Sequence, residues 1–462
     1  MPKKKTALTI EERLQQALVP AEEHPYEVPE NWVWVRLGSL AQDMADGPFG
    51  SNLKTEHYTN NKEVRIIQLS NIGENGWRED NKKYTTFEHA KVIARSKVEA
   101  GDIVIAKMMP AGRAIICPSY EQQYVLSSDA VKFVPNSLVD NNFCCKGINS
   151  YFFQTLVQEN TQGITRARTS IKKLKGYPFP LPPLSEQQRI VERIEELFAK
   201  LDEAKERLQE VADSFAVRKA AILHKAFTGE LTKQWRRENG VSDESWEEKK
   251  LEEVCSKITD GTHNSPTNSL SGEYMYVTAK NIKDTGIDLS NITYVTKEVH
   301  KEIYSRCDVI YGDVLYIKDG ATAGIATINT LEEEFSMLSS VALIRTDLKL
   351  AKNEFVKDYL NYRKKEILKN ISGSAITRLT LSKIKDILVP LPSLPEQHEI
   401  VRLIDDLLAR ERAAQQAAEQ ALASIDLMKK SILARALRGE LGTNKASEAS
   451  ALELLKQVLA EN

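Results

Sequence analysis

An eleven-residue stretch that occurs twice constrains the fold of this 462-residue chain more than any other feature. LPPLSEQQRIV begins at Leu181 and LPSLPEQHEIV begins at Leu391, a separation of 210 residues. A later pair, ILHKAFTGEL from Ile222 and ILARALRGEL from Ile432, keeps that separation. An inserted residue would rotate every later side chain of a helix by about 100 degrees, so this gap-free spacing predicts one long helix in each copy.

Apolar residues within both copies follow a heptad pattern, with steps of four and three residues. The second copy departs from the pattern at Glu411. One such run would favour an ordinary antiparallel coiled coil, whereas two equivalent runs indicate duplicated units around a shared helical core. The heptad positions singled out on the two helices are Ile190, Ile194, Leu197, Leu201, Leu208, Ile400, Ile404 and Leu407.

The segments before each helix also correspond, although their separation varies. NWVWVRLGSL from Asn31 resembles SWEEKKLEEV from Ser245, and AGDIVIAK from Ala100 matches YGDVLYIK from Tyr311. Short β-branched and aromatic runs bounded by Gly, Asn and Asp predict strands. We therefore expect a mixed α/β fold, in which two α+β globular domains are joined by two long antiparallel helices in a pseudo-twofold internal repeat. The predicted order is an N-terminal extension (1–30), a first domain (31–183), a central helix (184–230), a linker (231–244), a second domain (245–393), a C-terminal helix (394–441) and a tail helix (442–462).

Composition and motifs argue against several classes of protein. The chain is 42% hydrophobic and 28% charged, and it has no apolar run near the roughly 18 to 20 residues that span a bilayer. Its basic N-terminus lacks the apolar segment of a secretory signal, so we expect a cytoplasmic protein without a membrane partner. Cysteines and histidines show no metal-ligand spacing, and phosphate-binding, dinucleotide and nucleophile-elbow motifs are absent from the sequence. We expect neither a bound metal nor bond-breaking chemistry.

The distribution of charge is more informative than the net charge of −2. Between Glu159 and Glu186 there is no acidic residue, while basic residues crowd one stretch. A run of positive residues is usually a solvated face. Because the run recurs in the second copy, contact with DNA phosphates becomes as good an interpretation as a solvated face. The basic residues proposed for DNA contact are Arg166, Arg168, Lys172 and Lys173 in the first copy and Arg378 and Lys383 in the second.

Two glycine-containing loops occupy the same place in the two copies but carry different side chains. They are ADGPFGSNLK from Ala45 and TDGTHNSPTN from Thr259. Gly47 and Gly261 would be explained by tight turns alone. Alternatively, the loops read base edges through hydrogen-bonding side chains. The residues that this second interpretation names are Ser51, Asn52 and Lys54 in one loop and Thr262, His263 and Asn264 in the other.

With the repeat and the paired basic segments assembled, the sequence from about Asn31 to Leu441 resembles the specificity subunit of type I restriction-modification systems. The most specific elements are the two LP-x-L-x-EQ-x-x-IV entries, the TGEL and RGEL exits, and the segments ITR…SIKKLKGYPFPLP and ITRLTLSKIKDILVPLP. The resemblance implies two target recognition domains, each reading half of a split sequence in double-stranded DNA. It implies that the helices form a spacer and a docking surface for two modification subunits. The heptad residues named above are assigned to this spacer and docking surface.

The resemblance also implies a division of labour among subunits. The modification subunits bind S-adenosyl-methionine and methylate adenine, and restriction subunits use ATP and Mg. This chain would then bind no cofactor itself and would not be an enzyme.

Two other functions stay open from the sequence alone. One is a coiled-coil scaffold or adaptor without DNA readout, and the other is an enzyme with an unrecognised nuclease site. The C-terminal segment ASALELLKQVLAEN lies outside the resemblance and carries Leu452, Leu455 and Leu459 on one helical face. We expect it either to dock a partner subunit or to be a loosely packed tail.

Overall fold

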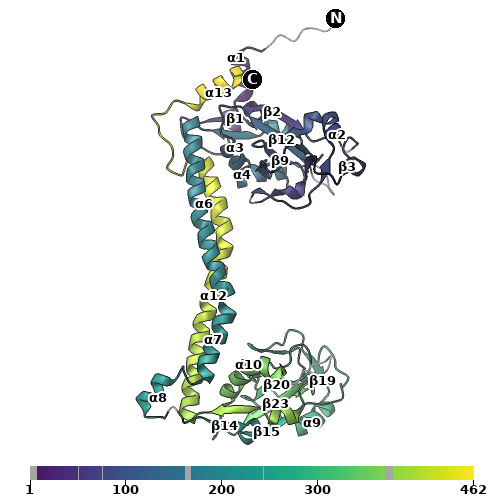
Figure 1. Cartoon of the computed structure of the whole chain (residues 1–462), viewed down its shortest axis with the longest axis vertical. Coiled ribbons are helices and arrows are strands. Elements are labelled where there is room, and N and C mark those ends of the chain that lie inside the picture. Colours follow the sequence, from purple (N-terminus) through teal and green to yellow (C-terminus); the bar gives the residue numbers. More distant parts are fainter. Residues whose placement is uncertain are drawn as a thin grey trace. The chain divides into compact units, whose positions relative to one another are not determined.

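The chain folds into two compact units in a computed structural model that describes residues 8–49, 51–74, 76–161, 168–242, 244–369 and 378–461. The first unit comprises Met1–Arg207 and Ala421–Asn462, and the second comprises Leu208–Gln420. Both units are mixed α/β, as the sequence predicts. Each combines a globular part with stretches of the two long helices (Figure 1).

The first unit contains a four-stranded sheet in the order β10-β9-β12-β2 and a five-stranded sheet in the order β3-β7-β4-β11-β8. Two short antiparallel pairs, β1 with β13 and β5 with β6, complete it. The strands are β1 (Val33–Arg36), β2 (Ala41–Asp46), β3 (Tyr58–Thr59), β4 (Val64–Ile67), β5 (Ile72–Gly73), β6 (Gly76–Trp77), β7 (Tyr84–Thr85), β8 (Lys97–Val98), β9 (Ile103–Ala106), β10 (Ala114–Ile116), β11 (Tyr124–Leu126), β12 (Ala130–Pro135) and β13 (Pro178–Leu181). The helices are α1 (Ile10–Ala17), α2 (Phe87–Val92), α3 (Asn141–Ile148), α4 (Tyr151–Glu159), α5 (Ile171–Gly176), α13 (Ala451–Glu461) and most of α6 (Leu184–Asp213).

The second unit repeats this topology. Its sheets have the orders β15-β23-β20-β21 and β19-β16-β22, with pairs β14–β24 and β17–β18. The strands are β14 (Glu247–Lys250), β15 (Cys255–Asp260), β16 (Tyr274–Val277), β17 (Ile282–Lys283), β18 (Gly286–Ile287), β19 (Thr293–Val295), β20 (Val314–Ile317), β21 (Ala326–Ile328), β22 (Phe335–Met337), β23 (Val341–Thr346) and β24 (Leu388–Leu391). The helices are α7 (Phe215–Phe227), α8 (Lys233–Asn239), α9 (Lys297–Arg306), α10 (Asn353–Lys369), α11 (Leu381–Lys385) and the first part of α12 (Leu394–Leu437).

The two long helices are confirmed, but the first copy is divided. α12 is continuous over 44 residues, whereas α6 ends at Asp213 and α7 begins at Phe215. At the break the Ser214 hydroxyl donates to the carbonyl of Glu210 at 2.6 Å, and the Arg218 guanidinium donates to the carbonyl of Val211 at 3.1 Å. Side chains that bond to backbone carbonyls compete with regular helical bonding, which explains the interruption.

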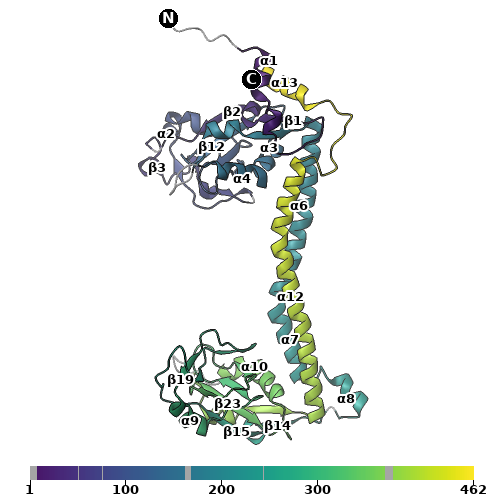
Figure 2. The same cartoon turned by 180° about the vertical axis from the view of Figure 1, so that it is seen from behind.

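The helices pack side by side within each unit (Figure 1; Figure 2). In the first unit Asp202 of α6 pairs with Lys429 of α12 at 2.6 Å. In the second unit Arg218 of α7 pairs with Glu411 of α12 at 2.5 Å. As the residue number rises on one helix it falls on the other, so the helices run antiparallel. The ion pair also explains why the heptad pattern is interrupted at Glu411.

The repeated Glu-Gln of the eleven-residue stretch ties each helix to its globular part. Glu186 is fully buried and accepts a hydrogen bond from Trp32 Nε1 at 2.7 Å. Its equivalent Glu396 is also fully buried and accepts from Arg236 at 2.7 Å. Buried carboxylates need such partners, because an unpaired buried charge is costly. The motif recurs because each helix must be anchored to a domain at its first turn.

The C-terminal segment belongs to the core of the first unit, so it is not a loosely packed tail. Docking of a partner subunit there stays a prediction. Leu455 and Leu459 are buried on α13, which packs against α1. Arg189 of α6 forms a two-pronged ion pair with Glu448 at 2.7 and 2.8 Å. The segment is therefore an integral element of this unit.

Candidate nucleic-acid interface

The loop that follows β2 in the first unit is pressed against the turn that follows β11. Gly47 N donates to the carbonyl of Ala130 at 3.0 Å. A Cβ atom on Gly47 would lie 1.8 Å from the carbonyl oxygen of Ser127. Glycine is required here because two backbone segments approach closely, not because the turn needs a positive φ.

The second unit makes a similar close approach through different hydrogen bonds. Thr262 N donates to the carbonyl of Met337 at 2.9 Å, and Ser339 N donates to the carbonyl of Thr262 at 2.8 Å. Pro48 stands at the place of Thr262 in the first unit and has no N–H to donate. A Cβ atom on Gly261 would lie 1.9 Å from the Met337 oxygen. Both loops are thus held at their start by backbone contacts.

A lysine lies beneath each loop and pairs with the aspartate that precedes the glycine. Lys107 Nζ lies 2.8 Å from Asp46 Oδ1, and Lys318 Nζ lies 3.6 Å from Asp260 Oδ2. Lys318 and Asp260 are each 2% exposed, and each also has a closer partner of opposite charge. Lys318 Nζ lies 2.9 Å from Asp319 Oδ2, and Arg306 lies 2.5 Å from Asp260 Oδ1. These pairs were missed from the sequence, although the match between AGDIVIAK and YGDVLYIK contains both lysines.

The segment that carries the predicted basic residues meets the same lysines through its backbone. Thr169 N donates to the carbonyl of Lys107 at 2.9 Å, and Leu379 N donates to the carbonyl of Lys318 at 2.8 Å. The preceding residues, Arg168 and Arg378, have side chains 49% and 64% exposed. In each unit the structure therefore brings together the glycine loop, the lysine and an exposed arginine.

Each of these arginines contacts one aspartate of its own unit. Arg168 lies 2.9 Å from Asp129, and Arg378 lies 3.5 Å from Asp319. Such partly exposed pairs are weak in water, so a phosphate can compete for the guanidinium. We define the glycine loop, the lysine and the arginine of each unit as its loop cluster.

The loop residues predicted to reach bases are mostly exposed. Ser51, Asn52 and Lys54 are exposed, and the turn is closed by Asn52 N donating to the carbonyl of Phe49 at 2.7 Å. In the second unit His263 and Asn264 are exposed and Thr262 is partly buried, and His263 Nε2 lies 3.4 Å from Asp260 Oδ1. The turn also presents Phe49, which is 82% exposed and was not among the predicted residues. An aromatic residue between proline and glycine in such a loop is the signal that could have found it.

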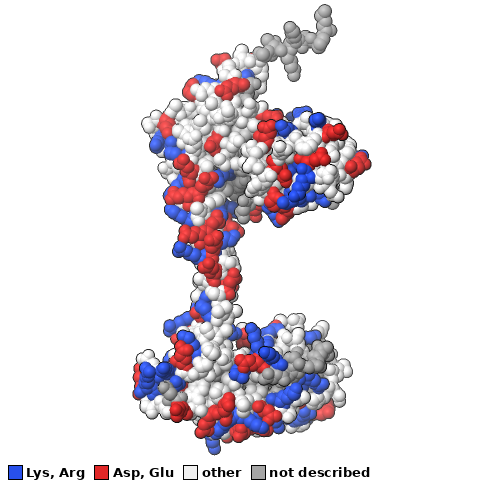
Figure 3. All heavy atoms as spheres, viewed as in Figure 1, with Lys and Arg blue, Asp and Glu red and all other residues white. Residues whose placement is uncertain are grey.

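The remaining predicted basic residues are less closely associated with the loop clusters. Lys172 lines a cavity with Arg13 and Arg36 near α1, and Lys173 donates to the carbonyl of Asn160 at 2.6 Å. Lys383 is exposed on α11. Arg166 lies outside the described residues. On the face shown in Figure 3, basic and acidic side chains are interspersed over both units, so no large surface of a single sign marks an interface there.

The heptad residues assigned to docking lie mainly inside the units. Ile190, Ile194, Ile400 and Ile404 are at most 1% exposed in their cores. The other four are partly buried, and they are Leu197, Leu201, Leu208 and Leu407. A partner that docks on these helices would therefore use their outward positions.

The described part of the chain lacks two features that would point to other functions. No three His, Cys, Asp or Glu side chains are grouped as a metal site requires. No helix there combines the length and the apolar character needed to cross a bilayer.

Comparison with known proteins identifies relatives over most of the chain. A family model described as the type I restriction modification DNA specificity domain matches residues 29–213 and 243–421. The EcoBI type I restriction enzyme specificity subunit of Escherichia coli is 28% identical, covering 67% of this chain and 69% of that protein. The EcoKI specificity subunit of Escherichia coli strain K12 is 24% identical, covering 94% of this chain and 96% of that protein.

A solved structure shares the fold. The HsdS subunit from Thermoanaerobacter tengcongensis superposes with a TM-score of 0.63 at 20% identity, covering 90% of this chain and 99% of that chain. The two family matches fall on the two repeats that the sequence contains.

Proposed function

This chain belongs to the family of type I restriction-modification DNA specificity subunits, and from that premise we propose that its two loop clusters are the surfaces that read DNA. The chain supplies the DNA sequence specificity of such a system, and it reads a target in two parts with two recognition domains. Each loop cluster would contact one half of the target. The coiled-coil scaffold without DNA readout is not favoured.

The observation that carries the assignment is the duplication of the loop cluster. In both units a glycine loop lies in close backbone contact with a neighbouring turn, and an equivalent backbone hydrogen bond joins the lysine to the segment that carries an exposed arginine. The side chains that follow the glycine differ, with Ser51 and Asn52 in one unit and His263 and Asn264 in the other. Arginine suits phosphate contact, and short polar side chains suit base edges.

The partners of this chain are DNA and other subunits of a restriction-modification system. We infer that the complex contains two modification subunits together with restriction subunits. The duplicated helices support it, because two equivalent surfaces can bind two copies of one partner. We also infer that S-adenosyl-methionine binds in the modification subunits, and ATP and Mg in the restriction subunits. The chain itself would then carry out no catalytic step.

An exchange of one recognition domain tests the assignment directly. Residues 31–180 are replaced by the corresponding domain of a relative, the chain is co-expressed with its modification subunits, and methylated sites are sequenced. We expect one half of the target to change while the other half is retained. Retention of both halves would refute the assignment.

A footprint and a cleavage assay address the alternatives. The complex should protect two patches of DNA about one helical turn apart, with protection that weakens as salt rises. Weak and salt-insensitive association would instead support a scaffold. Cleavage of DNA by the purified chain with Mg, abolished by one carboxylate substitution, would support a nuclease.

A further inference from the structure

A cavity of about 720 Å³ lies beside the glycine loop of the second unit. Ser265 and Asn268 of that loop line one part of it, and Leu338 and Ser340 come from the turn to which Thr262 is bonded. The volume lies within the roughly 300 to 1,000 Å³ typical of small-molecule sites. The cavity is thus continuous with the surface that we assign to DNA reading.

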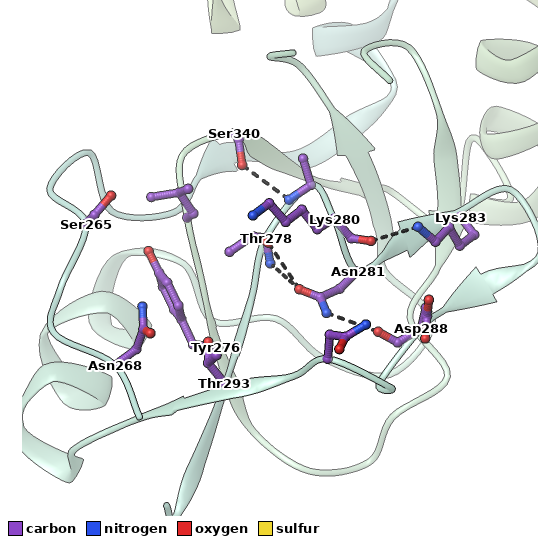
Figure 4. A pocket seen from close by; sticks show the side chains of 13 residues that line it. Ser265, Asn268, Tyr276, Thr278, Lys280, Asn281, Lys283, Asp288, Thr293 and Ser340 are labelled. Atoms are coloured by element: carbon purple, nitrogen blue, oxygen red, sulfur yellow. Dashed lines mark hydrogen bonds between the residues drawn. The ribbon is translucent and has the colours of Figure 1, made fainter. Parts of the chain in front are cut away.

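Tyr276 is the unexplained group in this cavity. Its side chain is 3% exposed, and its hydroxyl has no hydrogen-bond partner among the described residues. Figure 4 shows its ring between Asn268 and Thr278. Burial raises the pKa of Tyr276 to about 12, so the hydroxyl stays protonated at neutral pH. A buried donor without an acceptor is costly, and a bound ligand with an acceptor atom would remove that cost.

The framework around Tyr276 is already ordered by internal hydrogen bonds. Asn281 Oδ1 accepts from Thr278 N at 3.0 Å and from the Thr278 hydroxyl at 3.1 Å. Asn281 Nδ2 donates to the carbonyl of Asp288 at 3.0 Å. A site held in this way needs little rearrangement on binding.

The cavity also carries positive charge on its lining. Lys280 and Lys283 are exposed, and Lys283 Nζ donates to the carbonyl of Lys280 at 2.9 Å. Among the described residues no ion pair joins either ammonium group to a carboxylate, although Asp288 also lines the cavity. A ligand with a planar polar ring and a phosphate would satisfy both the tyrosine and the lysines.

The first unit has the same hydrogen-bonded framework but lacks the tyrosine and the lysine proposed to bind a ligand. Asn71 Oδ1 accepts from Gln68 N at 3.0 Å, as Asn281 does in the second unit. The strand register places Ile66 where the second unit has Tyr276. Ser70 stands 210 residues before Lys280. The ligand-binding groups are therefore an addition to the second unit and not a consequence of the fold.

We propose that this cavity takes up one nucleotide of the bound DNA, with the base beside Tyr276 and its phosphate near Lys280. This inference rests on the proposed DNA-reading function. Extruding a base from a duplex costs a few kcal/mol, and hydrogen bonds and stacking in a pocket can offset that cost. Uptake would add discrimination to the half of the target that the second unit reads.

The test uses the intact complex with its modification subunits and DNA that carries 2-aminopurine at one target position at a time. Unstacking raises 2-aminopurine fluorescence, so we expect a rise at one position in the half assigned to the second unit. Tyr276→Phe and Lys280→Ala should each reduce that rise about 2- to 10-fold, as expected for the loss of one hydrogen bond or charged contact. A separate rise, from 2-aminopurine at the adenine that the modification subunits methylate, should be unchanged in both variants.

Matched controls are available in the same unit. Tyr316 is also buried with an unpartnered hydroxyl but does not line the cavity, and Lys349 is exposed elsewhere. Tyr316→Phe and Lys349→Ala should leave the rise intact. Specific DNA binding and methylation without any Tyr276-dependent fluorescence would overturn the inference and leave the proposed function standing. Binding of free AMP that Tyr276→Phe abolishes, without uptake from DNA, would also overturn it. A complex that binds no DNA specifically would instead overturn the proposed function.

Discussion

Gly47→Ala is the sharpest test of the loop cluster in the first unit. The added Cβ would lie 1.8 Å from the Ser127 carbonyl oxygen and 3.3 Å from that of Ala130. The obstructing atoms are backbone, so the loop or the turn must shift, and the hydrogen bond from Gly47 N to Ala130 must lengthen. Overpacking of this kind costs about 1 to 3 kcal/mol in the free energy of unfolding.

The functional consequence should be confined to one half of the DNA target. A displaced loop moves Ser51 and Asn52 relative to Arg168, and base discrimination depends on that geometry. We expect relaxed specificity in the half read by the first unit and unchanged specificity in the other half. Sequencing of methylated sites after co-expression with the modification subunits measures both. Gly261→Ala should give the converse result.

Gly176→Ala is the matched control. A Cβ at Gly176 has no heavy atom within 4 Å, and its φ is not in the positive range. This variant should retain both stability and specificity. If Gly47→Ala unfolds at the same denaturant concentration as the parent chain and methylates the same sites, the close approach does not position the loop and the reasoning fails.

Arg168→Ala should weaken DNA binding across sequences and reduce the slope of log affinity against log salt by about 0.9 in a salt titration; an unchanged slope would remove Arg168 from the interface. Arg236→Met should lower the free energy of unfolding by about 3 to 5 kcal/mol, since it leaves Glu396 buried without this partner. The double variant Arg236→Met with Glu396→Met should recover most of that loss, as measured by denaturant unfolding. The pKa of Glu448 is lowered below its ordinary 4.5, mainly by side-chain hydrogen bonding from Arg189. The contribution of this ion pair to the stability of the folded state is therefore full above pH 4.5 and is lost as pH falls through the folded-state pKa. Proteolysis of the C-terminal segment should therefore accelerate as pH falls below 4.5 in the parent chain but not change further in Glu448→Gln.

The repeat allowed much of the fold to be predicted, because helical register and strand periodicity are local properties of a sequence. The matched segments AGDIVIAK and YGDVLYIK, for example, contain β9 and β20. The break at Ser214 was not, since it depends on which backbone carbonyls the serine and Arg218 side chains bond. Docking of α13 was missed for a similar reason. An amphipathic pattern shows that a face will be buried, but not what will bury it.

The candidate site was predictable only in part. Charge and turn chemistry indicated the glycine loops and Arg168, whereas the pairing of Lys107 with Asp46 depends on contacts across 61 residues. Phe49 was missed because an exposed aromatic cannot be told from a core aromatic by its identity alone. Residues that act through tertiary contacts leave little local signal.

The contacts duplicated between the units are largely made by backbone atoms or by side chains that bond to the backbone. Asn149 donates to the carbonyl of Ala114 at 2.7 Å, and Asn361 donates to that of Ala326 at 2.8 Å. The glycine loops are held by amide-to-carbonyl bonds and close approach. Side chains that follow each glycine can therefore change without releasing the loop, provided that the glycine and its carbonyl partner remain. Divergence between the units then falls on the residues that face a ligand, so one duplicated framework can present two different reading surfaces.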